Sequence, residues 1–205
     1  MRAVSLNGAV MHFREDGDAG GRPLFLINSL GTDFRVWDKL MPLMPEGLRI
    51  LRYDKRGHGL SELSPGPYSI DQLADDAAAL LDHLQLREVI VVGLSIGGLI
   101  GQSMAARRPD LVRAMVLMDT AAKIGTQEMW AERIAAVEAG GIESLADAVM
   151  QRWFSEGFGR NHPEELLVWR NMLTRTPDAG CADCSAAIAD ADYDIIRDIR
   201  KNVAN

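Results

Sequence analysis

The chain has few cysteines, few histidines and few aromatic residues. Its 205 residues include two cysteines, four histidines and 6% aromatic residues. Cys181 and Cys184 have the C-x-x-C spacing of a redox pair or half a metal site, but no second pair and no histidine lies at ligand spacing nearby. We therefore favour two thiols one turn apart on a helix, and we expect neither a metal nor an organic cofactor.

A basic excess and a long apolar run are also missing. Lys and Arg total 22 against 29 Asp and Glu, so the formal net charge is −7 and the pI is near 5.1. Nucleic acids and anionic membranes are bound through a positive field, which this composition does not supply. No apolar stretch approaches the roughly 20 residues of a membrane span, and the first residues lack a signal-peptide core. We expect a cytoplasmic protein with no nucleic-acid or membrane partner.

Apolar residues, 47% of the chain, follow the pattern of strands that alternate with helices. Asn7-Gly8 lies between two short alternating runs and indicates a hairpin, because both residue types tolerate positive φ. Ser69 is a candidate N-cap for an amphipathic helix over residues 70–84. The sequence predicts an α/β protein with a mostly parallel sheet and flanking helices over residues 1–120. The other expected elements are strands at 23–29, from 48, at 88–93 and at 113–120, and a helix that ends before Pro109.

After residue 120, helical patterns follow one another without a strand. Helices are expected over residues 129–139, 142–154, 163–173 and 181–190. We assign residues 121–200 to a helical lid and expect residues 201–205 to be a truncated end of the chain. The aromatic residues of this layer are expected mainly to pack within it. Trp130 and Trp153 are also candidates to line an apolar substrate pocket between the layer and the sheet.

The segment V-V-G-L-S-I-G-G-L-I-G at residues 91–101 suggests a catalytic serine. Gly93, Ser95 and Gly97 form the pattern G-x-S-x-G between a β-branched strand and a helix, which is the setting of a nucleophile elbow. Such a serine lies in a tight, strained turn, so the residues two before and two after it must be small. The helix N-terminus adds free N–H groups where an oxyanion develops. Ser95 is the predicted nucleophile; the alternative is an ordinary serine in a small-residue turn.

An oxyanion hole needs a second N–H donor, and the loop I-N-S-L-G-T-D at residues 27–33 is its expected source. We expect the backbone N–H groups of Leu30 and Ile96 to form the hole. Ser29 is a candidate for the substrate pocket and, like Asn28, for hydrogen bonds nearby. The alternative for this loop is a plain connection between two elements.

Three segments carry a resemblance to a known superfamily. N-S-L-G-T-D-F-R-V-W-D (28–38), R-Y-D-K-R-G-H-G-L-S (52–61) and G-L-S-I-G-G-L-I-G-Q-S (93–103) resemble the oxyanion loop, the R-G-H-G-x-S turn and the elbow of the α/β hydrolases. Within that superfamily the chain resembles the 3-oxoadipate enol-lactonases (β-ketoadipate enol-lactone hydrolases) of aromatic catabolism. This narrower resemblance rests on residues 120–126, Trp130 with Arg133, residues 152–154 and residues 180–192. It covers nearly the whole chain and implies an α/β-hydrolase fold with a helical lid.

The resemblance also implies that two catalytic residues are missing. In that fold the serine is followed by an acid after a later strand and then by a histidine, and this sequence ends before either, so we expect a chain that lacks the last two strands and the final helix. His162 is expected to be a solvated residue before a helix, and His58 a turn residue. Asp119, at a strand end, is the candidate substitute acid. No catalytic part is expected for the remaining histidines, His12 and His83.

The implied activity is the opening of 3-oxoadipate enol-lactone to 3-oxoadipate, with Ser95 attacking the carbonyl of a small-molecule lactone or ester. A general base contributes about 10²–10⁴-fold to such a step, so we expect little turnover from these residues without one. A related carboxylesterase or haloperoxidase-like hydrolase is the alternative enzyme. The second hypothesis is a non-catalytic hydrolase-like protein that binds a small acid or a partner, because an incomplete sheet exposes an edge and favours self-association.

Overall fold

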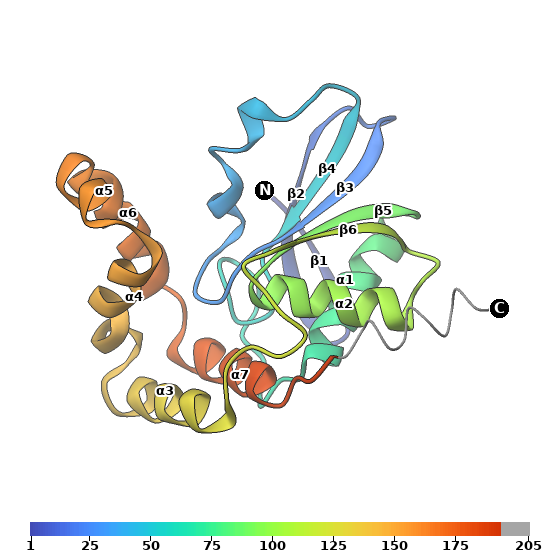
Figure 1. Cartoon of the computed structure of the whole chain (residues 1–205). Helices are drawn as coiled ribbons and strands as arrows, with labels where there is room; N and C mark the ends of the chain where they lie inside the picture. The colour runs from blue at the N-terminus through green and yellow to red at the C-terminus, as the bar shows by residue number, and fades with distance from the viewer. Residues whose placement is uncertain (194–205) are drawn as a thin grey trace.

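A six-stranded mixed sheet forms the centre of the protein (Figure 1). The structure is a computed structural model that describes residues 1–193. Strands β3 to β6 run parallel, whereas β2 is antiparallel to both β1 and β4. The predicted α/β class is confirmed, and the antiparallel strands lie at one side of the parallel ones. In spatial order the strands are β1 (Arg2–Leu6), β2 (Ala9–Gly17), β4 (Leu48–Tyr53), β3 (Arg22–Ile27), β5 (Val89–Leu94) and β6 (Val112–Met118).

The predicted hairpin at Asn7-Gly8 joins β1 to β2. Asn7 and Gly8 have φ angles of 49° and 77°, and Leu6 pairs directly with Ala9. Two successive positive φ angles in a two-residue loop match the right-handed twist of the flanking strands. The Asn7 side chain donates to Asp76 Oδ1 at 3.1 Å, so the turn is also attached to the first helix.

Helices cover one face of the sheet (Figure 1). Ser69 caps the first of them, because the Gln72 backbone N–H donates to Ser69 Oγ at 3.1 Å. The second ends before Pro109, which cannot continue a helix. The opposite face is covered by a segment with two short 3-10 helices. The bounds are α1 (Ile70–His83), α2 (Ile96–Arg107), η1 (Phe34–Trp37) and η2 (Met41–Leu43).

Strand β3 supplies side chains to both hydrophobic layers, because successive residues of a strand point to opposite faces. Phe25 and Ile27 belong to the core beneath α1 and α2, and Leu24 and Leu26 to a smaller cluster with Trp37. A strand covered on both faces needs a continuous apolar run, as residues 23–27 have. The loop after β3 therefore starts from a firmly packed point.

Between β6 and residue 193 the structure has six helical elements, and they depart from expectation in two places. The segment expected as one helix over residues 142–154 is helical over residues 142–153, but its first turn is a 3-10 helix. The backbone N–H and the hydroxyl of Ser144 both donate to the Gly141 carbonyl, which tightens this turn. The sequence does not predict α5, a six-residue helix that Ser155 caps by accepting from the Phe158 N–H at 3.2 Å. The bounds are α3 (Gln127–Gly140), η3 (Ile142–Leu145), α4 (Ala146–Trp153), α5 (Glu156–Asn161), α6 (Pro163–Thr174) and α7 (Asp178–Ala189).

Helix α7 packs on the core and on α3, whereas α4 to α6 extend away from the sheet (Figure 1). A Cβ on Gly180 of α7 would lie 2.2 Å from the Gly57 carbonyl oxygen, so only glycine permits this approach. Cys181 and Cys184, on the same helix, are buried free thiols, as favoured above. The helical segment is thus joined to the core through α7, and also through Leu173 of α6, which lies against Gly31 of the loop after β3. Residues 194–200 of the expected lid, and the expected end at residues 201–205, lie outside the described residues.

Strand β6 is an edge strand in the part of the chain that the structure describes, where β5 is its neighbour. The apolar residues Val116, Leu117 and Met118 are 49%, 44% and 40% exposed. An exposed apolar edge is a template for pairing with a further strand. The exposed edge that we expected is therefore present on this part of the chain.

Candidate active site

Ser95 lies in a sharp turn between β5 and α2. Its φ and ψ angles are 55° and −119°, a strained combination for a residue with a side chain, and its N–H donates to the Met118 carbonyl at 2.9 Å. Thr120 Oγ1 donates to the Ser95 carbonyl at 2.8 Å, so both backbone groups of the serine are held. The side chain is partly exposed at the N-terminus of α2. The predicted strand-to-turn-to-helix setting is what the structure has.

The glycines around Ser95 are required by close packing. A Cβ on Gly93 would lie 2.4 Å from the Gly97 carbonyl oxygen, and a Cβ on Gly97 would lie 2.2 Å from the Ile27 carbonyl oxygen. Both distances are far below ordinary van der Waals contact. The glycine pattern therefore lets α2 pass close to the ends of β5 and β3.

The loop after β3 lies beside the elbow because β3 and β5 are parallel neighbours. Ile27 at the end of β3 pairs with Gly93 of β5, so both strands deliver their next residues to the same edge of the sheet. Leu30 and Ile96 are both buried. Within residues 1–193 neither backbone N–H has a hydrogen-bond acceptor. Two free donors are thus available near the serine, and their use in an oxyanion hole stays a prediction.

Lys55 and His58 both form hydrogen bonds with the backbone of this loop. The sequence does not predict either contact. Lys55 Nζ donates to the Ser29 carbonyl at 2.5 Å, and His58 Nε2 accepts from the Gly31 N–H at 3.0 Å. His58 is fully buried, and this burial, with the nearby Lys55 charge, lowers the pKa of its imidazole well below the usual value. His58 is therefore a neutral residue that supports the loop.

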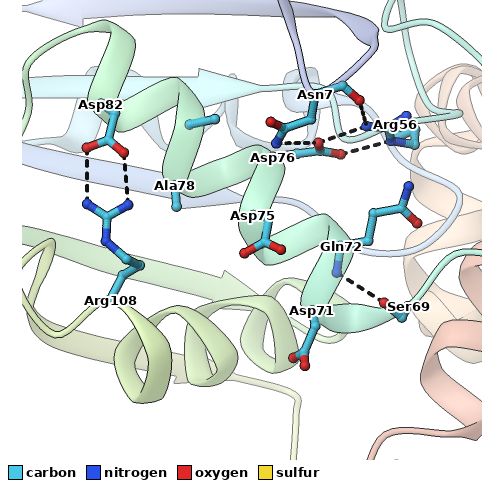
Figure 2. Close-up of a pocket in the computed structure, with 11 residues that line it drawn as sticks. Asn7, Arg56, Ser69, Asp71, Gln72, Asp75, Asp76, Ala78, Asp82 and Arg108 are labelled. Atoms are coloured by element: carbon cyan, nitrogen blue, oxygen red, sulfur yellow. Dashed lines mark hydrogen bonds and ion pairs between the residues drawn. The ribbon is translucent and has the colours of Figure 1, made fainter.

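Arg56 of the R-G-H-G turn joins three parts of the molecule (Figure 2). Its guanidinium donates to both carboxylate oxygens of Asp76 on α1, at 2.8 and 2.9 Å, and to the Asn7 carbonyl at 3.2 Å. Both members of this ion pair are almost fully buried. The pair lies at a cavity of about 530 Å³ along α1, where Arg108 pairs in the same bidentate way with Asp82. These charges are matched, which is typical of structural ion pairs.

The structure brings none of the remaining candidate groups to Ser95 by a hydrogen bond within residues 1–193. His162 is exposed directly before α6 and lies against the Phe158 ring at 5.2 Å. His83 is exposed on α1. Asp119 is exposed at the end of β6 with a φ of 47°. The placements of His162 and His83 agree with the predictions.

The sequence does not predict a buried pair of His12 and Asp54. His12 Nδ1 and Asp54 Oδ2 are 2.8 Å apart, and the histidine ring stacks on Phe34. The other Asp54 oxygen accepts from the Phe34 N–H at 2.8 Å, while Oδ2 also accepts from the Leu60 N–H at 3.0 Å. Both carboxylate oxygens therefore have partners, two of which are backbone N–H groups, and this is what a buried carboxylate needs.

Trp130 and Trp153, the pocket candidates, both contact the main core. Trp130 is buried, and its Nε1 donates to the Ile124 carbonyl at 2.6 Å; Trp153 is partly buried. A separate cavity of about 820 Å³ lies among α4, α5 and α6 and is lined by Met150, Phe154 and Leu166, among others. Neither tryptophan lines that cavity, and their contact with a substrate stays a prediction.

Between residues 1 and 193, no cluster of three or more His, Cys, Asp or Glu side chains is arranged to hold a metal ion. None of the helices described there has the length and apolar character of a membrane span.

The chain belongs to the alpha/beta hydrolase fold family, whose sequence model matches residues 22–139. This match includes the loop after β3, the R-G-H-G turn, the elbow and all but the last residue of α3. The family supports a hydrolase of the ester-cleaving kind as the broad class.

Particular relatives are enol-lactonases and an esterase. The 3-oxoadipate enol-lactonase 2 of Acinetobacter baylyi is 36% identical over 92% of this chain and 71% of its own length. The crystal structure of the enol-lactonase from Burkholderia xenovorans has 38% identity and a TM-score of 0.90, over 94% of this chain and 75% of that one. A thermophilic esterase from Thermogutta terrifontis has 26% identity and a TM-score of 0.86, over 94% and 74% of the two chains.

Proposed function

We propose that the chain opens an enol-lactone of the 3-oxoadipate type by nucleophilic catalysis at Ser95, as part of aromatic catabolism. The observation that carries this proposal is the strained turn at Ser95 next to the acceptor-free N–H groups of Leu30 and Ile96. The substrate class is supported by the enol-lactonases among the relatives. A small lactone or ester is the only partner that the proposal requires.

In the proposed reaction, Ser95 Oγ bonds to the lactone carbonyl carbon and gives up its proton to a base or to water. The ring C–O bond breaks, and the electron pair leaves with the enol oxygen, which is protonated and becomes a ketone by tautomerisation. Water then hydrolyses the acyl-serine ester, so that lactone and water yield 3-oxoadipate. The Leu30 and Ile96 N–H groups would donate to the oxyanion in both steps.

The rate of this reaction depends on what activates the serine. Within residues 1–193 no histidine hydrogen-bonds to the Ser95 hydroxyl. A positioned base contributes about 10²–10⁴-fold, whereas oxyanion stabilisation alone leaves a residual acceleration. We therefore propose slow acylation of Ser95 and little turnover by these residues.

Acylation by an activated ester tests the proposal directly. After incubation with p-nitrophenyl acetate, intact-mass and peptide mass spectrometry should find a slowly formed acetyl adduct on Ser95. Ser95→Ala should remove it, and Ser103→Ala is the control, because Ser103 lies on the same helix α2 with its hydroxyl bonded to Asp71. An adduct spread over other residues, or equal labelling of Ser95→Ala, would contradict the proposal. A rapid burst on Ser95 would instead show that a base is present.

Other substrates and a non-catalytic role are the alternatives. A preference for simple aliphatic esters over the enol-lactone would favour a related carboxylesterase, since the chain is also similar to the esterase from Thermogutta terrifontis. Binding of a small carboxylic acid without any adduct would favour a hydrolase-like binding protein.

We also propose that the apolar edge of β6 pairs with a second copy of the chain, since Val116, Leu117 and Met118 are exposed on it.

A further inference from the structure

Lys55 is an ionisable side chain buried beneath the loop after β3. It is 1% exposed, and its ammonium group donates to the carbonyl oxygens of Ser29 at 2.5 Å and Asn28 at 3.5 Å. No carboxylate forms an ion pair with it in the described part of the chain. A buried cation that is satisfied by backbone carbonyls alone is costly. The loop provides a reason to bury Lys55, because the hydrogen bonds of its ammonium group fix the backbone at Asn28 and Ser29.

The contact with Ser29 sets the direction of the next N–H group. In a trans peptide the carbonyl and the N–H point in opposite directions. Because Lys55 Nζ holds the Ser29 oxygen, and Thr32 Oγ1 donates to the same oxygen at 2.9 Å, the Leu30 N–H points away from Lys55. The following N–H, of Gly31, is turned the other way and donates to His58 at 3.0 Å. Two successive N–H groups thus have fixed and different directions.

We propose that Lys55 is a positioning residue for the oxyanion-binding amide: it orients the Leu30 N–H toward the substrate oxygen at Ser95 and, by polarising the Ser29 carbonyl, makes that N–H a stronger donor. A hydrogen bond to the carbonyl of a peptide strengthens the bond that its N–H donates. This inference rests on the proposed function of Ser95. It adds a side chain that touches neither the serine nor the substrate.

The positioning is expected to depend on pH. Burial lowers the pKa of Lys55 to about 8, against smaller opposite effects of nearby groups. The groups that face it are Cys184 and Cys181 on α7, Asp54 and Asp33 in the loops, and His58, which is itself neutral. Above this pKa the ammonium becomes an amine, a weaker donor to Ser29. The hold on the Leu30 N–H should therefore weaken as the pH rises through about 8.

Selective isotope labelling can observe this amide without any enzyme activity. The sequence has three Ser-Leu pairs, at residues 5–6, 29–30 and 144–145. Protein labelled with 1-¹³C-serine and ¹⁵N-leucine therefore gives three carbonyl-coupled amide signals, from Leu6, Leu30 and Leu145. Between about pH 6.5 and 9.5, the Leu30 amide and Ser29 carbonyl signals should titrate with a midpoint near that of Lys55. Leu6 and Leu145 serve as internal controls and should not follow this titration.

Variants assign the titration to Lys55. Lys55→Met should abolish the titration of the Leu30 signal and displace that signal, with Leu6 and Leu145 unmoved. Thr32→Val, which removes the neutral donor to the same oxygen, should retain the titration. If Lys55→Met does not fold, the proposal is tested by the pH titration of the Leu30 signal in the unsubstituted protein, with Leu6 and Leu145 as controls. A Leu30 signal that is flat with pH, that titrates unchanged in Lys55→Met, or that moves together with Leu6 and Leu145 overturns the proposal.

The kinetic consequence is measured separately, so that the two proposals fail independently. Where acetylation of Ser95 is detectable, Lys55→Met should slow it by about 10-fold, less than the roughly 10²–10³-fold loss that follows removal of an oxyanion donor. Absence of acylation in the unsubstituted protein would count against the function of Ser95 and leave the Leu30 titration as the test of Lys55. An acylation rate that Lys55→Met leaves unchanged would overturn the positioning role.

Discussion

Strands β5 and β6 are parallel neighbours with similar apolar sequences, V-I-V-V-G-L and V-R-A-M-V-L-M, and they lie in opposite environments. β5 lies between β3 and β6 and is covered on both faces, so most of its residues are buried. β6 has one neighbour in the described part of the chain, and most of its residues are exposed. A strand's composition therefore indicates how much burial it can use, and its place in the sheet decides how much it receives.

The difference in burial between β5 and β6 also applies to the candidate site residues, because Ser95 follows β5 and Asp119 follows β6. The buried end of β5 fixes Ser95, and its neighbour β3 fixes the loop with Leu30, so both predicted donors rest on firmly packed strands. Asp119 follows the exposed end of β6 and has no comparable support. A site that needs groups held within a fraction of an ångström is better supported at β5 than at β6.

Adding one carbon to the first turn of α2, directly after β5 and Ser95, should have the largest effect. Gly97→Ala would place its Cβ 2.2 Å from the Ile27 carbonyl oxygen, so the backbone must shift. We expect a loss of about 3 kcal/mol or more in the free energy of unfolding, measured by urea denaturation. Gly20→Ala is the control, because the nearest atom to its added Cβ lies at 3.6 Å. A Gly97→Ala protein as stable as the Gly20→Ala protein would contradict the close packing of the elbow.

The comparison of buried and exposed positions can be extended to charged residues with Lys55, which is buried, and Lys123, which is exposed. The folded-state pKa of Lys55, about 8, lies below its ordinary value of 10.5, so between these two pH values the unfolded chain binds a proton that the folded chain does not. Stability from this group should therefore rise with pH across that window, by up to about 3 kcal/mol.

Denaturation at several pH values measures this effect as the difference between the unsubstituted protein and Lys55→Met. Taking this difference removes the opposing contributions of Cys184 and other groups. Lys123→Met is the control, because the exposed Lys123 pairs with Asp192 in solvent after β6. A difference for Lys55→Met that does not change between about pH 8 and 10.5 would show that the ammonium is not buried as the structure has it.

Valine-to-alanine substitutions at two directly paired residues give the most direct comparison of β5 and β6. Val92 of β5 pairs with Val116 of β6, and their side chains belong to residues that are 8% and 49% exposed. Val92→Ala should cost about 2 kcal/mol, from lost burial and a small cavity, and Val116→Ala less than about 0.5 kcal/mol. Equal losses would mean that something covers β6 in solution, and urea denaturation of both variants distinguishes these cases.

A charge on β6 should change association while leaving stability almost unaltered. Leu117→Lys should stay within about 0.5 kcal/mol of the unsubstituted protein, and it should reduce self-association in sedimentation velocity over a range of concentrations. Leu63→Lys is the matched control, because Leu63 has the same 44% exposure in a loop. An unsubstituted protein that sediments as a monomer at every concentration would contradict pairing through β6.

Elements with strong local signals were predicted correctly. The Asn7-Gly8 hairpin, the Ser69 cap and the elbow glycines each depend on φ preferences or contacts within a few residues. The change from 3-10 helix in η3 to α-helix in α4 depends on the Ser144 hydroxyl, whose local hydrogen bond competes with the α-helix that the apolar pattern favours. Helix α5 is too short for a periodic pattern to indicate it.

The sequence by itself determined which residues could form the elbow at Ser95 and the turn at Asn7-Gly8, because backbone strain and steric clearance are properties of neighbouring residues. Only the tertiary structure decided that Lys55 holds Ser29, that His12 pairs with Asp54, and that β6 is exposed where β5 is buried. These contacts join residues 26 and 42 positions apart in the chain, and strand order decides burial. No local pattern specifies such partners, since their free energy depends on which surfaces the whole fold removes from water.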